Sequence, residues 1–96
     1  MSAWTIDDEG IHWAKFRGRT PKCNGCIIAE DHEGNRAPGT WDYKTGFVNL
    51  FDIPMGPLVR WTYARIVQYH SESENVCTIF YDNGKEVDIK ELYDLS

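Results

Sequence analysis

The sequence has little that could cross a membrane or enter a secretion pathway. All of its apolar runs fall short of the ~18 consecutive apolar residues that a transmembrane helix needs. The segment 1–9 has neither a basic start nor an apolar stretch, so we expect no signal peptide. The chain holds only three cysteines, and without an export signal these predict reduced thiols. We therefore expect a soluble intracellular protein, in the nucleus or the cytoplasm.

Motifs of common enzyme classes are missing as well. There is no G-x-x-x-x-G-K-[ST], no G-x-G-x-x-G and no H-E-x-x-H. The carboxylates of segment 7–9 and of Glu72 and Glu74 fall in predicted loops, where burial cannot raise a pKa into the range of acid–base catalysis. We predict a protein that is not an enzyme and needs no cofactor.

Helical periodicity is also lacking, because no apolar stripe at helical spacing exceeds about two turns. Alternation of apolar and polar residues instead predicts a mainly β chain. The predicted strands are 11–16, 26–30, 46–51, 59–69, 76–82 and 85–90. Segment 31–39 holds two glycines and a proline, so it is predicted to be an exposed loop.

The Asn83-Gly84 pair lies between the last two predicted strands, where it predicts a two-residue turn of type I′. Matching the apolar residues across this turn predicts which side chains point inward. They are Cys77, Ile79, Tyr81, Val87 and Ile89, together with Ala64 and Ile66.

Cys23 and Cys26 form a C-x-x-C pair, the spacing at which two thiolates reach one zinc ion. A closed zinc site needs four ligands, and the remaining candidates are scattered: His12, His32, His70 and Cys77. A redox pair would normally open a helix, whereas Cys26 begins a predicted strand. Zinc at Cys23 and Cys26 is therefore an alternative to two ordinary small residues near a turn.

Charge is distributed unevenly around a net value of −5. From residue 72 to residue 94 there are seven acids and two lysines, a balance that attracts cationic partners such as basic peptide tails. Segment 15–22, in contrast, has four bases and no acid: Lys15, Arg17, Arg19 and Lys22. This basic patch could contact nucleic acid locally, with Trp13 or Phe16 stacking on a base.

Aromatic residues are abundant, with four Trp, five Tyr and four Phe among 96 residues. Several fall near the ends of predicted strands. Rings that converge beside an acid or an amide can form a cage for a methylated ammonium group through cation–π attraction. Binding is therefore a more natural role for this sheet than catalysis.

Segment 43–95 resembles a Tudor domain of the Royal superfamily. The residues that carry the resemblance are Gly46-Phe-Val-Asn-Leu-Phe51, Trp61-Thr-Tyr-Ala-Arg-Ile66, Tyr81-Asp-Asn-Gly-Lys-Glu-Val-Asp-Ile89 and Glu91-Leu-Tyr-Asp-Leu95. The resemblance implies a small, strongly bent antiparallel SH3-like barrel over residues 41–96. Residues 1–40 would then be a β-rich N-terminal extension or half-barrel.

The resemblance also implies a binding site. Phe51, Tyr81 and Asn83 fall on positions of the methyl-lysine cage, and Trp61 or Tyr63 could supply a further ring. Thr62 and Lys85 stand where the family has aromatic residues, and we expect Lys85 to point outward or to pair with an acid such as Glu72 or Glu74.

The leading prediction is thus an aromatic, acidic face that binds a basic or methylated, histone-tail-like peptide in chromatin. Two alternatives remain open. One is nucleic-acid binding through the basic patch, and the other is a small acidic protein that blocks a basic site on a partner.

Overall fold

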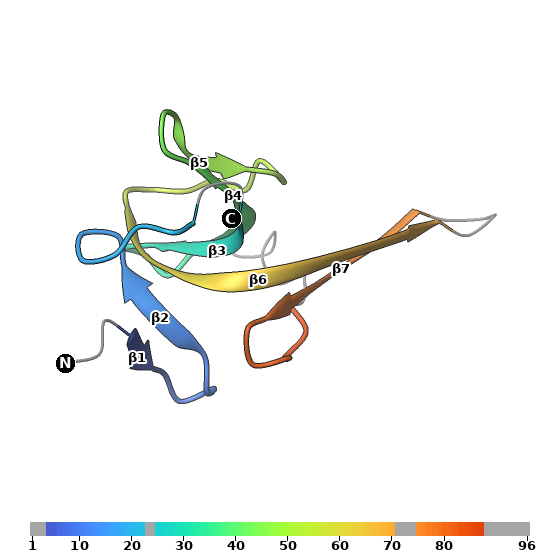
Figure 1. Cartoon of the computed structure of the whole chain (residues 1–96), viewed down its shortest axis with the longest axis horizontal. Coiled ribbons are helices and arrows are strands. Elements are labelled where there is room, and N and C mark those ends of the chain that lie inside the picture. The colour runs from blue at the N-terminus through green and yellow to red at the C-terminus, as the bar shows by residue number, and fades with distance from the viewer. Residues whose placement is uncertain (1–3, 23–24, 71–74, 88–96) are drawn as a thin grey trace.

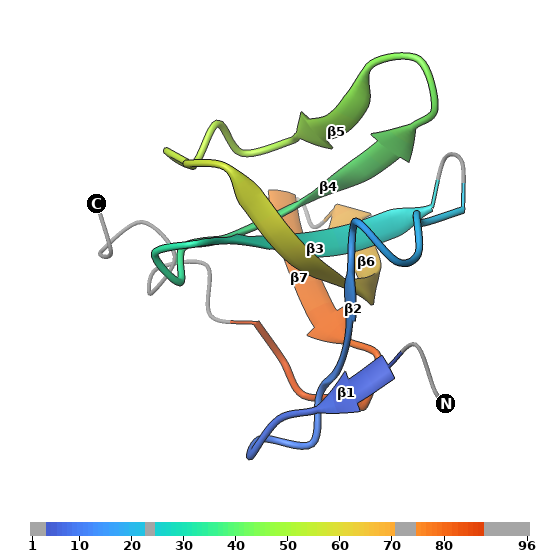
Figure 2. The same ribbon diagram turned by 90° about the vertical axis from the view of Figure 1, so that its left-hand side faces the viewer.

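Seven strands form one antiparallel sheet in the computed structural model, which describes residues 4–22, 25–70 and 75–87. The strands are β1 (Trp4–Ile6), β2 (His12–Lys15), β3 (Cys26–Asp31), β4 (Arg36–Asp42), β5 (Gly46–Asn49), β6 (Leu58–His70) and β7 (Asn75–Tyr81). Their order is β1-β2-β6-β3-β4-β5, and β7 pairs with β6. The β4–β5 hairpin lies at one end of the sheet and the β1–β2 hairpin at the other (Figures 1 and 2). The prediction of a mainly β chain is confirmed.

The described part of the sheet is open. Strands β1 and β5 end the strand order, and no pairing between them is found among the described residues. An antiparallel sheet is therefore present, but a closed barrel is not shown. The predicted boundary between residues 40 and 41 falls inside β4, and β3 from the first predicted unit pairs with β6 from the second.

Strand β6 organises the sheet. Its first half pairs with β3 from Leu58 to Tyr63, and Arg60 and Trp61 also pair with β2. Its second half pairs with β7 from Ala64 onward. Figure 1 shows β6 and β7 extending together away from the other strands. Because β6 has thirteen residues, it can pair with three neighbouring strands. The predicted strand 59–69 is confirmed as the central part of β6, and the predicted strand 76–82 is confirmed as β7.

Three hairpin turns share one geometry, and it differs from the predicted type I′ turn. In the turn after β7, the N–H of Gly84 donates to Tyr81 O (2.9 Å), and the N–H of Tyr81 donates to Lys85 O (2.8 Å). Gly84 has a φ of 89°, but Asn83 is not among the residues with positive φ. A type I turn followed by one glycine in the left-handed region accounts for this pattern. Gly10 and Gly34 close equivalent turns, so the glycine was read correctly and the role of Asn83 was wrong.

Segment 31–39 is not the exposed loop that its glycines and proline predicted. Residues 36–42 form β4, and Ala37, Pro38 and Gly39 are buried. Gly39 marks a close approach, because a Cβ placed there would overlap the carbonyl oxygen of Val48 and lie 2.7 Å from the ring of Phe47. The glycine thus serves packing between β4 and β5.

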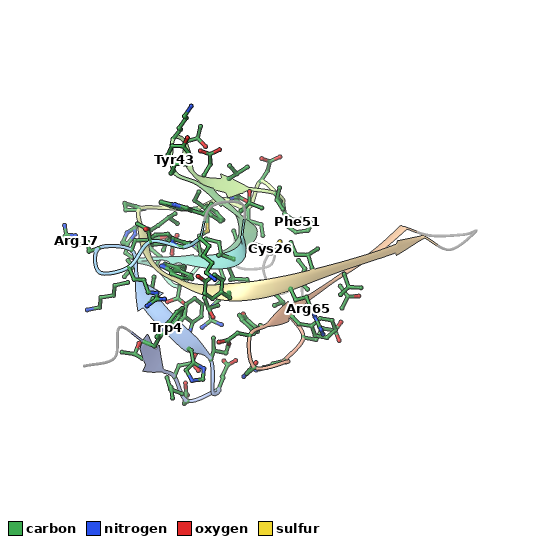
Figure 3. All side chains as sticks on the ribbon, viewed as in Figure 1. Trp4, Arg17, Cys26, Tyr43, Phe51 and Arg65 are labelled. Atoms are coloured by element: carbon green, nitrogen blue, oxygen red, sulfur yellow. The ribbon has the colours of Figure 1, made fainter. Side chains whose placement is uncertain are left out.

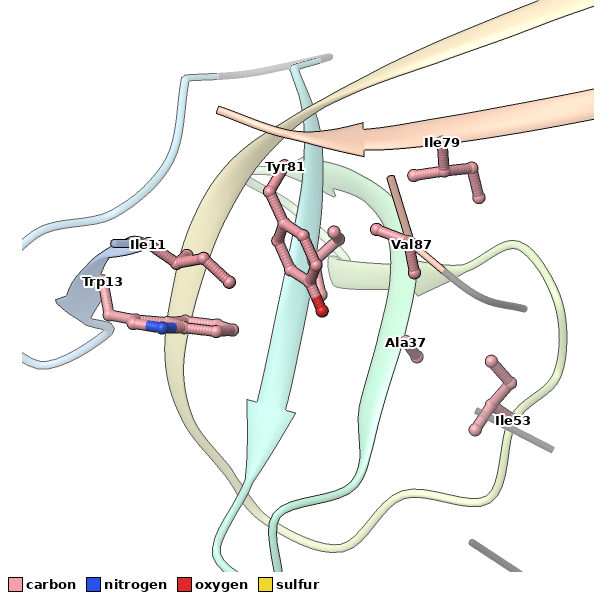
Figure 4. Packing of buried hydrophobic residues seen from close by; sticks show 8 residues of the cluster. Ile11, Trp13, Ala37, Ile53, Ile79, Tyr81 and Val87 are labelled. Carbon is pink, nitrogen blue, oxygen red and sulfur yellow. The ribbon is translucent and has the colours of Figure 1, made fainter. Parts of the chain in front are cut away.

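Two apolar clusters lie on opposite faces of the sheet. The first contains the buried residues Ile11, Trp13, Ile28, Ala37, Ile53, Ile79, Tyr81 and Val87 (Figure 4). Ala64 and Ile66 are partly buried and pack against this cluster. This confirms the predicted inward positions, except that Ile89 and the side chain of Cys77 lie outside the described residues. The second, called here the aromatic cluster, has Ala14, Ile27 and Trp61 buried and Trp4, Phe16, Trp41, Phe47 and Tyr63 partly buried. Neighbouring residues of a strand point to opposite faces, which divides Trp13 from Ala14 and Ile27 from Ile28.

Asp31 ties the connection between β5 and β6 to the β3–β4 turn. Its Oδ2 accepts hydrogen bonds from the backbone N–H of Gly56 (2.8 Å) and from Asn35 Nδ2 (2.9 Å). Its Oδ1 accepts from the backbone N–H groups of Glu33 (2.9 Å) and Asn35 (2.8 Å). Burial opposes ionisation of this side chain, but the four hydrogen bonds outweigh it and lower the pKa of Asp31 to about 2.

Candidate functional site

The face of the sheet that carries the aromatic cluster ends in a shallow depression of about 260 Å³. Its lining comes from three strands and one turn: Trp4 on β1, His12 on β2, Tyr63 on β6 and Asp82 directly after β7. The strand register explains why these side chains meet. Trp4 pairs with Ala14, and Ala14 pairs with Trp61, so alternate residues of the three strands share one face.

Two rings form the aromatic side of this depression. The centroids of Trp4 and Tyr63 lie 5.8 Å apart, and their planes are inclined by 40°. Buried Trp61 lies beneath both, at 5.2 Å from Trp4 and 4.8 Å from Tyr63. Its Nε1 donates to Arg19 O at 2.7 Å, which fixes the indole. The two outer rings therefore rest on a rigid support.

The other side of the depression carries charge. Asp82 Oδ2 lies 3.5 Å from His12 Nδ1, and both side chains are partly open to solvent. The Arg19 guanidinium lies 5.3 Å from the centroid of the Trp4 ring. One indole of the site therefore already contacts a cation from its own chain. Rings beside a carboxylate form a setting suited to a cationic group.

A second depression of about 410 Å³ adjoins the first and shares Tyr63 and Asp82 with it. Its lining is Tyr63, Ala64, Arg65, Phe80, Tyr81, Asp82, Asn83 and Gly84. The Arg65 guanidinium lies over the Phe80 ring, 5.3 Å from the centroid. Figure 3 shows Trp4 on the β1–β2 hairpin and Arg65 on β6. Together the two depressions form a concave surface about the start of the β6–β7 hairpin.

The five residues predicted as a cage do not converge on one site. Tyr63, Tyr81 and Asn83 line the second depression. Trp61 is fully buried, and Phe51 packs against the first cluster, on the opposite face. Trp61 is therefore separated from a shared ligand surface by its burial beneath Trp4 and Tyr63, and Phe51 by its place on the opposite face.

Tyr81 belongs mainly to the core. It is 7% exposed, and its hydroxyl accepts a hydrogen bond from Arg36 Nη1 at 3.1 Å. Asn83 is exposed and donates from Nδ2 to Glu9 O at 3.2 Å. Both are therefore positioned by contacts within the chain, Tyr81 toward Arg36 and Asn83 toward the β1–β2 turn.

Lys85 pairs with an acid, as expected, but the partner is Glu9. The Nζ–Oε2 distance is 2.6 Å, and this hydrogen bond raises the pKa of Lys85. Glu72 and Glu74 lie outside the described residues. Lys85 lines neither depression, so its charge does not occupy the candidate site.

Trp4 and Asp82 were not predicted as site residues, and His12 was considered only as a scattered zinc ligand. Trp4 lies in a segment with too few residues to show alternation, and β1 was not predicted as a strand. Asp82 belongs to the turn motif, from which only Asn83 and Gly84 were used in the predictions. Alternation along the predicted strand 59–69 did place Tyr63 on the face opposite to Ala64. This was the sequence signal that could have identified Tyr63 as a site residue.

The basic patch begins at the last residue of β2 and continues on the connection that follows. Its members are all exposed: Lys15, Arg17, Arg19 and Lys22. Trp13 is only 1% exposed and cannot stack on a base. Phe16 is partly buried, with its ring 5.4 Å from Trp41. Of the two aromatic residues predicted to stack on a base, only Phe16 is accessible enough to do so.

A more buried charged cluster lies on the opposite face, beside Trp13. Glu30 accepts a hydrogen bond from Arg36 Nε (2.7 Å) and two from Arg60, from Nε (2.7 Å) and Nη2 (3.2 Å). The Arg36 and Arg60 guanidiniums lie 4.8 and 4.3 Å from the Trp13 ring centroid. Burial opposes ionisation of Glu30, but the arginines outweigh it and lower its pKa. Because the charges satisfy one another, we assign this cluster to stability.

Metal ligands do not gather in the described part of the chain, where no group of three or more His, Cys, Asp or Glu could hold an ion. Cys26 is half-buried at the start of β3, and Cys23 lies outside the described residues. In these same ranges, no helix is long and apolar enough to cross a membrane. The chain matches no family model, no curated protein and no solved structure.

Proposed function

We propose that this chain is a non-enzymatic, Tudor-like interaction module that binds a basic or methylated side chain of a peptide. The ligand cation would occupy the depression between Trp4, His12, Tyr63 and Asp82. One observation supports this most directly: two rings 5.8 Å apart share a depression with a carboxylate. The resemblance of segment 43–95 to Tudor domains supports the same ligand class, and a closed SH3-like barrel is part of this proposal.

Two interactions would favour a cation here. Contact with a ring face contributes about 0.5–2 kcal/mol, more as the cation loses water. Asp82 adds a Coulomb attraction that is moderate at a partly exposed site. The net charge of −5 would also steer a basic peptide toward the protein. Methylation strengthens the contact with the rings, because methyl groups weaken the hydration of the ammonium.

The depression is open, and its two rings are too close together for a group to lie between them. A ligand would therefore lie across Trp4 and Tyr63, with its cation near Asp82. Such a surface suits a basic histone-tail-like segment, which is extended and can lie along a sheet. It also predicts modest affinity, since only one side of the cation is covered.

The test is an NMR titration with a histone-tail-like peptide that carries lysine or trimethyl-lysine at one position. We expect amide shifts concentrated at Tyr63 and Asp82. Tyr63→Ala and Asp82→Asn should each weaken binding by roughly tenfold, since each removes one of the two favourable terms. Asp42→Asn makes the same charge change in a distant turn and should leave affinity unchanged.

Shifts confined to other residues, or equal affinity for all four proteins, would contradict the proposal. A parallel titration with short single strands of nucleic acid covers the alternative ligand. Salt-sensitive binding that is lost when Arg17 and Arg19 are both replaced by Ala, without shifts at Tyr63, would assign the function to the basic patch instead.

A further inference from the structure

We propose that the peptide bound by this face carries an acidic side chain two residues away from its cationic one, and that Arg65 binds the acid. This inference rests on the proposed function, because it concerns the second depression beside the proposed cation site. The two depressions share Tyr63 and Asp82, so a ligand in one necessarily approaches the other. Their linings differ in charge, with a carboxylate in both and a guanidinium only in the second.

Arg65 differs from the arginines of the charged cluster. Arg36 and Arg60 both bind Glu30. Within the described ranges, no carboxylate forms an ion pair with Arg65, whose side chain is exposed and lies over Phe80. A stacked guanidinium keeps its N–H edge directed outward, and that edge matches a carboxylate in a bidentate arrangement. Arg65 is therefore a positioned donor group without an acidic partner among the described residues.

The spacing on β6 sets the spacing in the ligand. Tyr63 and Arg65 are two residues apart on one strand, so their side chains share a face at a separation of about 7 Å. An extended peptide has the same two-residue repeat. When its cation lies over Tyr63 and near Asp82, the side chain two positions away lies beside Arg65.

The face also continues beyond Arg65. Val67 follows at the next alternate position of β6 and is 37% exposed. Three features therefore follow one another along this surface at alternate positions of β6: a carboxylate with two rings, a guanidinium on a ring, and an exposed valine. A ligand with cationic, acidic and apolar side chains at alternate positions complements it, whereas a second lysine beside Arg65 would be repelled.

Five matched peptides test the inference on the intact chain. They are nine residues long, carry trimethyl-lysine at the centre, and differ only at one position two residues before or after it. Two of the peptides have Glu or Gln two residues before the trimethyl-lysine, and the other three have Glu, Gln or Lys two residues after it. We expect one of the Glu peptides to bind roughly fivefold more tightly than its Gln counterpart at low salt. If that peptide carries Glu after the trimethyl-lysine, the Lys peptide should bind most weakly of the five.

Variants separate this inference from the proposed function. Arg65→Gln should abolish the preference for Glu over Gln while the Gln peptides still bind. Arg17→Gln makes the same charge change on the basic patch and should keep the preference. Asp82→Asn should weaken all five peptides. Equal affinity for Glu and Gln peptides, or a preference that survives Arg65→Gln, would overturn the inference and leave the cation site standing. Failure of every peptide to bind would overturn both.

Discussion

Asp31 offers the sharpest test of what holds this sheet together. Its carboxylate is 2% exposed and accepts four hydrogen bonds, two at each oxygen. Asn at position 31 keeps the shape but turns one acceptor into a donor. Either orientation of the amide then directs an NH₂ group at two N–H donors. The substitution therefore breaks two hydrogen bonds and leaves their donors unsatisfied.

Two routes give the magnitude, and both rest on the same four hydrogen bonds. Losing two hydrogen bonds to a buried charged group costs about 2–4 kcal/mol. The pKa of Asp31 is lowered from 3.8 to about 2, which by linkage corresponds to about 2 kcal/mol of stability. Both routes agree on a loss that is large against the ~5–15 kcal/mol expected for the whole domain.

The sign of the pH dependence is also defined. Because the folded-state pKa is below the unfolded one, the contribution of Asp31 is fully present above pH 3.8. It is lost as the pH falls from 3.8 toward 2. The stability difference between wild type and Asp31→Asn should therefore be constant near neutral pH and shrink by about 1 kcal/mol by pH 3, because that pH lies between the unfolded and folded pKa values.

The measurement is urea denaturation followed by tryptophan fluorescence at pH 7, 5, 4 and 3. Asp42→Asn is the matched control. Asp42 ends β4 at a hairpin turn and, within the described ranges, accepts a single backbone hydrogen bond, from the N–H of Lys44 (2.7 Å), which an amide oxygen can also accept. We expect the control to change stability by less than about 0.5 kcal/mol. A pH-independent difference between wild type and Asp31→Asn, or one as small as the control, would refute the reasoning.

Four further substitutions, one of them a control, test the packing and the ion pairs by urea denaturation at pH 7. Thr62 is fully buried, and its hydroxyl has no hydrogen-bond partner in the described structure. Thr62→Val should therefore stabilise the fold by about 1 kcal/mol. A clear loss of stability would show that the hydroxyl is bonded. Gly39→Ala should lower the stability by more than about 3 kcal/mol, because its Cβ would meet the Val48 carbonyl. Gly34→Ala has open space around its Cβ but a φ of 89°, so it should lower the stability by about 1 kcal/mol. Equal losses of stability for the two variants would contradict this. Glu30→Gln should cost roughly 2–4 kcal/mol, since it leaves two partly buried guanidiniums without a carboxylate, and a loss below 0.5 kcal/mol would show that solvent screens them.

Much of the local structure followed from the sequence. Alternation of apolar residues located five of the seven strands, because a strand with one buried face must repeat with period two. The same rule separated Ile79 and Tyr81 from their neighbours and matched them to Val87. Glycine marked the turns because few other residues adopt a positive φ.

Strand β4 shows why local rules failed where packing dominates. Pro38 and Gly39 are turn residues by propensity, yet both are buried in a strand. Close contact with β5 requires a residue without a Cβ at position 39, and no local pattern contains that requirement. The missed strand was thus a tertiary effect.

The candidate site was decided almost entirely by the tertiary structure. Alternation assigns each side chain to a face of its own strand, but it does not determine which strands become neighbours. The pairing of β1 with β2, and of β2 with β6, brings Trp4 and His12 to Tyr63 from more than fifty residues away. The sequence by itself determined a twisted antiparallel sheet rich in rings. Long-range pairing alone determined which rings meet a carboxylate, because the hydrogen bonds and burial that select strand order arise only when distant segments come together.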